Sequence, residues 1–177
     1  MAKKDHLTEE LNRHFGFGTF KGNQKAIIEN VLAGKDTFVL MPTGGGKSLT
    51  FQVPTLSREG ICLVITPLVA LMKDQVDNLR SRGIRAAYLH AGMTRREMIV
   101  TLDNCLYGRY KFLYISPERL DTELFIARIK GLPVSFIVVD EAHCISQWGY
   151  DFRPAYLKIA DIRYILPKVP ILALTAT

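Results

Sequence analysis

Short apolar runs alternate along the chain with longer segments in which apolar residues recur every three or four positions. Six runs are rich in β-branched or aromatic residues and have the length of a buried strand. These runs are residues 37–41, 61–66, 86–90, 112–116, 134–140 and 171–175. Continuous apolar strands separated by helical segments are typical of a parallel sheet with helices on both faces. The pattern therefore predicts an α/β fold with a mainly parallel central sheet.

Helical periodicity is clearest in three segments. The apolar face of the first segment consists of Leu68, Leu71, Met72, Val76 and Leu79. Gly83 stands where a glycine commonly closes such a helix. Thr94 and Glu97 form a capping box at the start of a second helix, because each side chain can accept from a free backbone N–H group. Residues 1–34 are predicted to be a helical lead-in that ends at Gly34, and residues 35–177 the main domain.

Composition narrows the class of protein. With 177 residues, of which 48% are hydrophobic and 23% charged, the chain can bury the core of one domain. The formal net charge of +6 favours a polyanionic partner. No apolar run is long enough to span a membrane and no signal peptide is seen, so we expect a cytoplasmic protein, nucleoid-associated if bacterial. Cys62, Cys105 and Cys144 are widely spaced, which predicts three reduced thiols.

Polar residues follow the predicted strands at one end of the sheet. They occur in six segments, residues 41–43, 66–67, 90–92, 116–118, 140–141 and 175–177. In an open parallel sheet the carboxyl ends of the strands form the crevice where ligands bind. The sequence therefore predicts a functional edge.

The segment MPTGGGKS, residues 41–48, is the strongest local signal. Gly44, Gly45 and Gly46 follow Thr43, and successive glycines let backbone N–H groups surround phosphate oxygens before the positive end of a helix. Lys47 would reach the β and γ phosphates of ATP, and the Ser48 hydroxyl would bind Mg²⁺. A glycine-rich turn with a chance lysine is the alternative, and Met41 stands where the strict motif has glycine.

A second signal is the apolar strand that ends in Asp140 and Glu141. A cation beside Asp140 would offset the cost of desolvating its charge, which makes it a candidate Mg²⁺ partner. Glu141 would polarise the attacking water. Taken alone, such a pair of carboxylates is as typical of a helix N-terminus as of a catalytic site. The presence of Lys47 and Ser48 in the same chain favours the catalytic interpretation. No other residue stands at metal-ligand spacing from His143. We therefore interpret His143 as a residue that couples neighbouring groups through hydrogen bonds.

A third signal is CISQWGYDFRPAY, residues 144–156, which contains the single tryptophan, Trp148. Exposed aromatic rings stack on unpaired bases and arginine binds phosphate, so Trp148, Phe152 and Arg153 suit single-stranded nucleic acid. The alternative interpretation, of equal weight, is that Trp148 and Phe152 anchor a loop against the core. The residues alone leave these two interpretations open.

Six segments together resemble the ordered motif series of RecQ-type DNA helicases. They are FKGNQ (residues 20–24), MPTGGGKS, ITPLVALMKDQV (65–76), YISPERL (114–120), DEAHCISQWGYDFRP (140–154) and LALTAT (172–177). DEAH is shared by many superfamily-two ATPases, whereas its continuation into the aromatic stretch resembles RecQ proteins in particular. The resemblance covers nearly the whole chain.

This resemblance implies a three-layer RecA-like P-loop fold and a motor that uses Mg-ATP to unwind DNA in the 3′ to 5′ direction. Gln24 is similar to the residue that reads the adenine edge. Thr43, Gly44, Gly45, Gly46 and Lys47 match nucleotide-binding positions, and Ser48 and Asp140 match the metal positions. Lys47, Asp140, Glu141 and His143 match catalytic positions.

The same resemblance implies contacts with single-stranded and partly duplex DNA. The matching positions are Thr66, Pro67, Lys73, Ser116, Pro117, Arg119, Gln147, Trp148, Phe152, Arg153, Thr175 and Thr177. The last two would link the DNA and ATP sites, and Tyr150 departs from the usual histidine. The chain matches only the first RecA-like domain, so a second such domain is an expected partner, without which hydrolysis should be slow. An RNA helicase of the DEAD-like class and a non-catalytic nucleic-acid-binding module are the alternatives.

Overall fold

The computed structural model describes residues 5–42, 44 and 46–177. Its strands are β1 (Thr37–Leu40), β2 (Ile61–Ile65), β3 (Ala86–Leu89), β4 (Phe112–Ile115), β5 (Val134–Val139) and β6 (Ile171–Thr175). The α-helices are α1 (His6–Phe15), α2 (Gln24–Leu32), α3 (Leu49–Leu56), α4 (Val69–Ser81), α5 (Arg95–Tyr107), α6 (Glu123–Ile129) and α7 (Ile159–Ile165). Three short 3₁₀ helices are η1 (Pro117–Arg119), η2 (Ala142–Ile145) and η3 (Pro154–Lys158).

The six strands form one parallel sheet in the order β1-β6-β5-β2-β4-β3. Because all strands run in the same direction, their carboxyl ends share one edge. This confirms the predicted α/β class, and the polar segments that follow the strands lie along one edge of the sheet.

Five of the six strands end one residue earlier than predicted. At four of these ends the next residue still donates one backbone hydrogen bond to the neighbouring strand: Met41 N to Thr175 O at 3.0 Å, Asp140 N to Ile65 O at 2.9 Å, Thr66 N to Ile115 O at 3.1 Å and Ser116 N to Leu89 O at 3.0 Å. Beyond that bond the chain turns away from the sheet, which frees the polar side chains at the edge to form a site.

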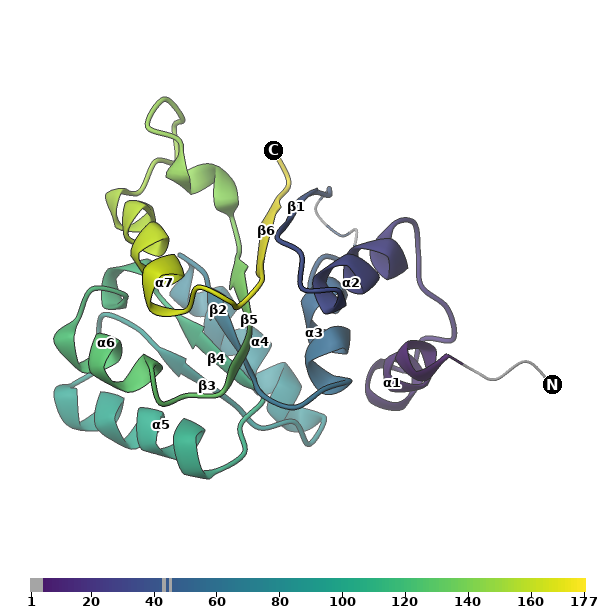
Figure 1. The fold of residues 1–177 in the computed structure, drawn as a ribbon, viewed down its shortest axis with the longest axis horizontal. Helices are drawn as coiled ribbons and strands as arrows, with labels where there is room; N and C mark the ends of the chain where they lie inside the picture. Colours follow the sequence, from purple (N-terminus) through teal and green to yellow (C-terminus); the bar gives the residue numbers. More distant parts are fainter. Residues whose placement is uncertain (1–4, 43, 45) are drawn as a thin grey trace.

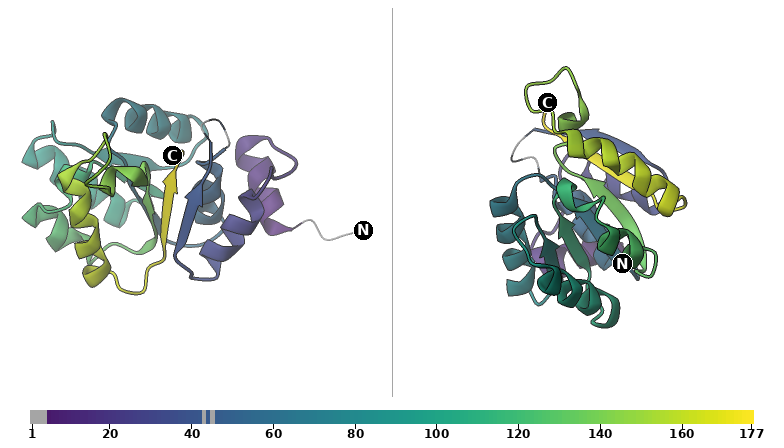
Figure 2. Two further views of the ribbon diagram at one scale, coloured as in Figure 1. Left: turned by 90° about the horizontal axis from the view of Figure 1, so that it is seen from above. Right: turned by 90° about the vertical axis from the view of Figure 1, so that its left-hand side faces the viewer.

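Helices cover the two faces of the sheet and create a separate core on each (Figures 1 and 2). On one face, apolar side chains of α5, α6 and α7 pack against residues such as Leu63, Leu113 and Ile137. On the other, α2, α3 and α4 pack against alternate residues of the same strands, including Val64 and Val138. The alternation explains why the strands are apolar along their whole length. The molecule therefore has three layers.

The lead-in consists of two helices that pack on α3. Leu11 of α1, Ile28 of α2 and Val53 of α3 are fully buried in a small third core. Gly16 ends α1 in the left-handed conformation, with φ +76°. This packing brings the segment before α2 to the helix that follows residues 41–48.

All three cysteines are free and at most 3% exposed. Burial raises the pKa of both the Cys62 and the Cys105 thiol to about 12 and also raises the pKa of Cys144. The prediction of reduced, buried thiols is confirmed. Among the described residues, no helix combines the length and apolar composition needed to cross a bilayer.

Candidate ATP and nucleic-acid site

The phosphate-binding loop, residues 41–48, connects β1 to α3 at the carboxyl edge of the sheet. Thr43 and Gly45 lie outside the described residues. Gly44 and Gly46 have φ of +80° and +78°, a conformation that side chains disfavour. The Lys47 carbonyl accepts from both the backbone and the side chain of Thr50, which anchors the start of α3 beneath the loop. The strand, loop and helix are arranged as a phosphate cradle requires.

The Gln24 side chain links the lead-in to this loop. The side chain is 3% exposed. Its amide donates to the Gly46 carbonyl at 3.2 Å, and its carbonyl accepts from the Lys21 amide at 2.8 Å. A Cβ atom at Gly46 would lie 2.3 Å from the Gln24 amide nitrogen, so a larger residue would displace the Gln24 side chain as well as strain the backbone at φ +78°.

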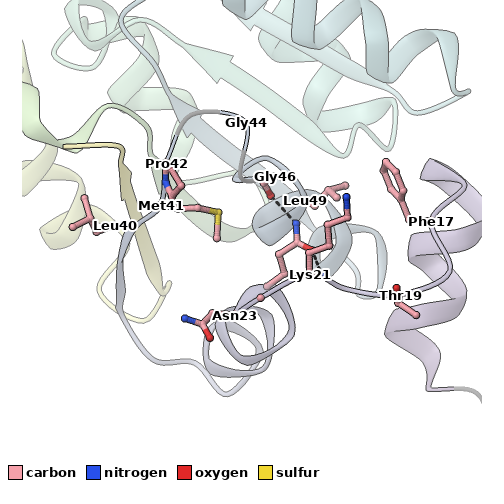
Figure 3. A pocket seen from close by; sticks show the side chains of 12 residues that line it. Phe17, Thr19, Lys21, Asn23, Leu40, Met41, Pro42, Gly44, Gly46 and Leu49 are labelled. Atoms are coloured by element: carbon pink, nitrogen blue, oxygen red, sulfur yellow. Dashed lines mark hydrogen bonds between the residues drawn. The ribbon is translucent and has the colours of Figure 1, made fainter.

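A cavity of about 490 Å³ opens beside Gln24. Figure 3 shows Phe17, Lys21 and Asn23 from the lead-in on one side, and Met41 and Pro42 from the loop on the other. Its lining is largely apolar, with polar atoms near Gln24. A flat heterocycle with a polar edge fits such a cavity next to a phosphate cradle.

Asp140 and Glu141 follow β5 directly, at the same edge of the sheet as the phosphate-binding loop, with β6 between β5 and β1. Burial raises the pKa of the Asp140 carboxyl group, and the nearby Glu141 carboxylate adds to this rise. The Glu141 amide, which donates to Asp140 Oδ1 at 2.9 Å, and the charges of Lys47 and His143 act in the opposite direction. Burial thus disfavours the negative charge of Asp140, and a bound cation would offset that cost.

The residues present fit a magnesium ion that is shared with phosphate. No cationic side chain among the described residues forms an ion pair with Asp140, and no three His, Cys, Asp or Glu side chains there cluster as a metal cage. Mg²⁺ commonly takes one or two protein oxygens, substrate phosphates and water. Ser48, half-buried at the start of α3, and Asp140 would supply those protein oxygens.

His143 contacts three parts of the functional edge. Its Nδ1 lies 2.9 Å from Thr175 Oγ1 at the end of β6 and 3.4 Å from Glu141 Oε2. Its Nε2 lies 3.4 Å from Asp151 Oδ2. The Thr175 hydroxyl also donates to the Thr177 carbonyl and accepts from the Thr177 amide. The imidazole therefore contacts a candidate catalytic carboxylate, the last strand and the following aromatic stretch.

The aromatic loop, residues 146–153, projects from the end of the sheet at which β6 also ends (Figure 1). The Trp148 and Tyr150 side chains are fully exposed, with 97% and 109% of their reference area accessible, so Trp148 does not anchor the loop to the core. Phe152 and Arg153 are half-buried and line a cavity of about 500 Å³ that also contacts Glu141 and Pro67. The loop thus presents two free rings while its base borders Glu141, a candidate catalytic carboxylate.

The other residues matched to DNA contacts differ in accessibility. Thr66, Pro67, Ser116 and Pro117 are buried, whereas Lys73 is exposed on α4. A hydroxyl that is buried at a strand end cannot contact a ligand directly. Such a residue binds a ligand through its backbone groups, or only after the site rearranges. Ser116 Oγ has no hydrogen-bond partner among the described residues.

Arg119 is engaged within the protein. Its guanidinium donates to the carbonyls of His90, Ala91 and Met93 at 3.0, 2.6 and 2.9 Å. In this structure it holds the turn between β3 and α5, instead of presenting a free cation to a phosphate. The sequence gives the charge of Arg119 but not the three carbonyls that surround it.

Two further polar residues at this edge were absent from the predicted site. Asp151 contacts His143, and the Tyr156 hydroxyl donates to the Asp140 carbonyl at 2.8 Å. Both contacts depend on how the aromatic loop folds back on η2. The only sequence signal is their place within or just after the DFRP segment.

The comparison with known families decides the assignment. The profile described as "DEAD/DEAH box helicase" matches residues 21–177. The chain belongs to the DEAD/DEAH box helicase family. The match includes Gln24, the phosphate-binding loop and the carboxylates after β5.

Relatives in this helicase family have RecQ-type names, which confirms the resemblance. The chain is 48% identical over 172 residues to "Probable ATP-dependent DNA helicase RecS" of Bacillus subtilis, covering 97% of this chain and 34% of the relative. It is 46% identical to "ATP-dependent DNA helicase RecQ" of Pasteurella multocida, covering 98% and 28%. The chain therefore spans about a third of the length of these curated relatives.

Solved structures confirm the helicase fold. The "DUF1998 helicase MrfA bound to DNA and AMPPNP" matches with a TM-score of 0.77 at 16% identity, covering all of this chain and 27% of that one. The structure of the same helicase bound to DNA without the nucleotide matches with a TM-score of 0.78. At this level of identity the likeness shows the fold.

Proposed function

We propose that this chain is the ATP-binding N-terminal motor domain of a RecQ-type DNA helicase. It couples Mg-ATP hydrolysis to 3′ to 5′ movement along single-stranded DNA and to duplex unwinding. The observation that carries the proposal is the contact of His143 with both Glu141 and Asp151. This imidazole joins a catalytic carboxylate to a loop with an exposed tryptophan. Family membership and relatives named as DNA helicases support it.

The ATP half of the proposal assigns one task to each polar group. The glycine amides and Lys47 hold the phosphates, while Gln24 faces the base in the adjoining cavity. Ser48 and Asp140 hold Mg²⁺, which when bound neutralises charge on the transferring phosphoryl group. Glu141 orients the water and accepts its proton. His143 fixes the position of the Glu141 carboxylate relative to β6.

The DNA half depends on the aromatic loop. Trp148 stacks on an unpaired base because every base offers a π face, and Arg153 and the exposed Lys73 attract phosphates. DNA that displaces the loop moves Asp151, which changes its contact with His143 and so the setting of Glu141. Hydrolysis is then faster when DNA is bound.

Full activity requires a second RecA-like domain. In related phosphoryl-transfer systems an arginine from a neighbouring domain accelerates the reaction roughly 10³-fold or more. We expect the isolated chain to bind nucleotide weakly, hydrolyse it slowly and leave a duplex intact. Near-complete unwinding activity from the purified chain would contradict this part of the proposal.

Trp148 fluorescence provides the central test, since it is the single tryptophan. The purified chain is titrated with single-stranded DNA, with and without Mg²⁺ and a non-hydrolysable ATP analogue. We expect a DNA-dependent change in emission whose midpoint shifts when nucleotide is present. A matched titration with RNA of the same sequence tests the alternative of an RNA helicase.

Each outcome separates one part of the proposal from another. No response to DNA in a folded, nucleotide-binding chain would limit the function to the ATPase half. Tighter binding to RNA than to DNA would favour the DEAD-like alternative. Binding of DNA without any affinity for nucleotide would leave a nucleic-acid-binding module.

A further inference from the structure

Glu141 has an unusual backbone conformation for a side chain with a proposed catalytic task. Its φ and ψ are +52° and +45°, and it is one of two non-glycine residues with positive φ among the described residues. A left-handed conformation costs on the order of 1 kcal/mol for such a residue, so neighbouring contacts must hold it.

Both polar ends of the peptide unit that precedes Glu141 are engaged. The N–H group donates to Asp140 Oδ1 at 2.9 Å. The C=O group, which belongs to Asp140, accepts from the Tyr156 hydroxyl at 2.8 Å. Rotation of this peptide plane changes φ of Glu141 and hence the direction of its carboxylate. The hydrogen bond from the Tyr156 hydroxyl to the Asp140 carbonyl opposes that rotation. It leaves the Asp140 carboxylate free for other contacts.

Tyr156 is well placed to hold the peptide rigidly. Its side chain is fully buried in the core beneath α5, α6 and α7, so the hydroxyl has no competing water. Burial is the main reason that the pKa of its hydroxyl is raised well above the ordinary value, which keeps it a neutral donor. It lies in η3, which packs on η2, the short helix that starts just after Glu141.

The aromatic loop ends three residues before Tyr156. Arg153 closes the loop by donating from its amide to the Cys144 carbonyl at 2.9 Å, and its carbonyl accepts from the Tyr156 amide at 2.9 Å. Pro154, at the first position of η3, restricts the backbone between them. A displacement of the loop base is therefore transmitted to η3 within one turn.

We propose that Tyr156 is a positioning residue whose hydroxyl sets the Asp140–Glu141 peptide and transmits the state of the aromatic loop to Glu141. The inference rests on the proposed ATPase function. It adds a second connection between loop and carboxylate, through the backbone, to the side-chain connection through His143.

The test variant is Tyr156→Phe, which keeps the ring and removes the hydroxyl. Tyr164→Phe is the matched control, because Tyr164 is 83% exposed on α7 and its side chain has no hydrogen bond to another described residue. Amide exchange of Glu141, followed by NMR, should be about fivefold faster in the test variant and unchanged in the control. This measurement needs no enzymatic activity.

Kinetics supply the functional readout. We expect kcat for ATP to fall on the order of tenfold in Tyr156→Phe, with the KM for ATP and the affinity for single-stranded DNA within about twofold of the wild type. A general loss of structure would instead change all three together with the melting temperature. An unchanged Glu141 amide or an unchanged kcat overturns the proposal.

A wild-type measurement covers the case of a variant that does not fold. Once Trp148 fluorescence reports bound DNA, the Glu141 and Tyr156 amide resonances should both shift. Bound DNA that leaves both resonances in place overturns the connection to the loop. A wild-type chain without ATP hydrolysis refutes the proposed function, and the Glu141 exchange rate then decides separately whether Tyr156 holds the peptide.

Discussion

At the scale of single residues, the types of the candidate ATP-site residues follow from the sequence, whereas their partners do not. Lys47 and Asp140 are recognisable because few other residue types bind a phosphate or a metal ion at the end of a buried strand. Contacts such as Asp151 with His143 depend on a loop whose path no periodicity defines. Arg119 illustrates the same limit, since its charge alone suggests a phosphate and its surroundings are three carbonyls.

The raised pKa of the Asp140 carboxyl group predicts how the free energy of unfolding depends on pH. Its folded pKa lies above the ordinary 3.8, so between the two values the folded state binds the proton more tightly. The free energy of unfolding therefore falls as pH rises through that window, and the ionised carboxylate destabilises the fold above it. Asp140→Asn should raise the melting temperature at pH 7 by about 2–4 °C for each kcal/mol relieved.

Scanning calorimetry with and without Mg-ATP checks this prediction. The wild type should gain stability when Mg-ATP binds, and Asp140→Asn should gain much less. Asp121→Asn serves as the control because Asp121 is exposed. A lower melting temperature for Asp140→Asn at pH 7 would show that its hydrogen bond to Glu141 outweighs the cost of burial.

At the scale of elements, the sheet was predictable because every strand is apolar along its length. All six strands were located, and five of them end one residue earlier than predicted. Helices α6 and α7 were not predicted from the sequence, because each is only seven residues long and shows less than two helical turns of periodicity. Long α4 and α5 were identified, with Gly83 at φ +76° after α4.

The capping box of α5 offers an element-scale prediction. The structure confirms it: Thr94 Oγ1 accepts from the Glu97 amide at 3.2 Å and Glu97 Oε2 accepts from the Thr94 amide at 2.7 Å. Thr94→Ala should lower the free energy of unfolding by about 1 kcal/mol in urea denaturation. Thr101→Ala, inside the same helix, should cause no such loss because alanine is the better helix former. Equal effects of the two changes would argue against the cap.

At the scale of the whole molecule, the net charge and the single exposed tryptophan would make different contributions to the proposed binding of nucleic acid. The charge of +6 acts on any phosphate chain and is screened by salt. Stacking on Trp148 is local and nearly insensitive to salt. A chain with both should bind single strands with an affinity that salt weakens but does not abolish.

Salt titrations of oligonucleotide anisotropy separate these contributions. If about three phosphates are neutralised, a fourfold increase in salt should lower the affinity roughly 20-fold. Lys73→Ala should reduce the slope of log affinity against log salt by about 0.7. Trp148→Ala should instead lower the affinity at every salt concentration and leave the slope unchanged. A changed slope for the tryptophan variant would mean that the loop acts through charge.

The burial of all three native thiols has a practical consequence for observing these movements. Because the pKa values of Cys62, Cys105 and Cys144 are raised and their side chains are covered, maleimide dyes at neutral pH should spare them. A cysteine introduced by Ser146→Cys at the base of the aromatic loop would then be the one reactive position. The Ser146→Cys variant can thus carry one dye two residues from Trp148, and quenching of that dye by the indole ring can be followed as nucleotide is added.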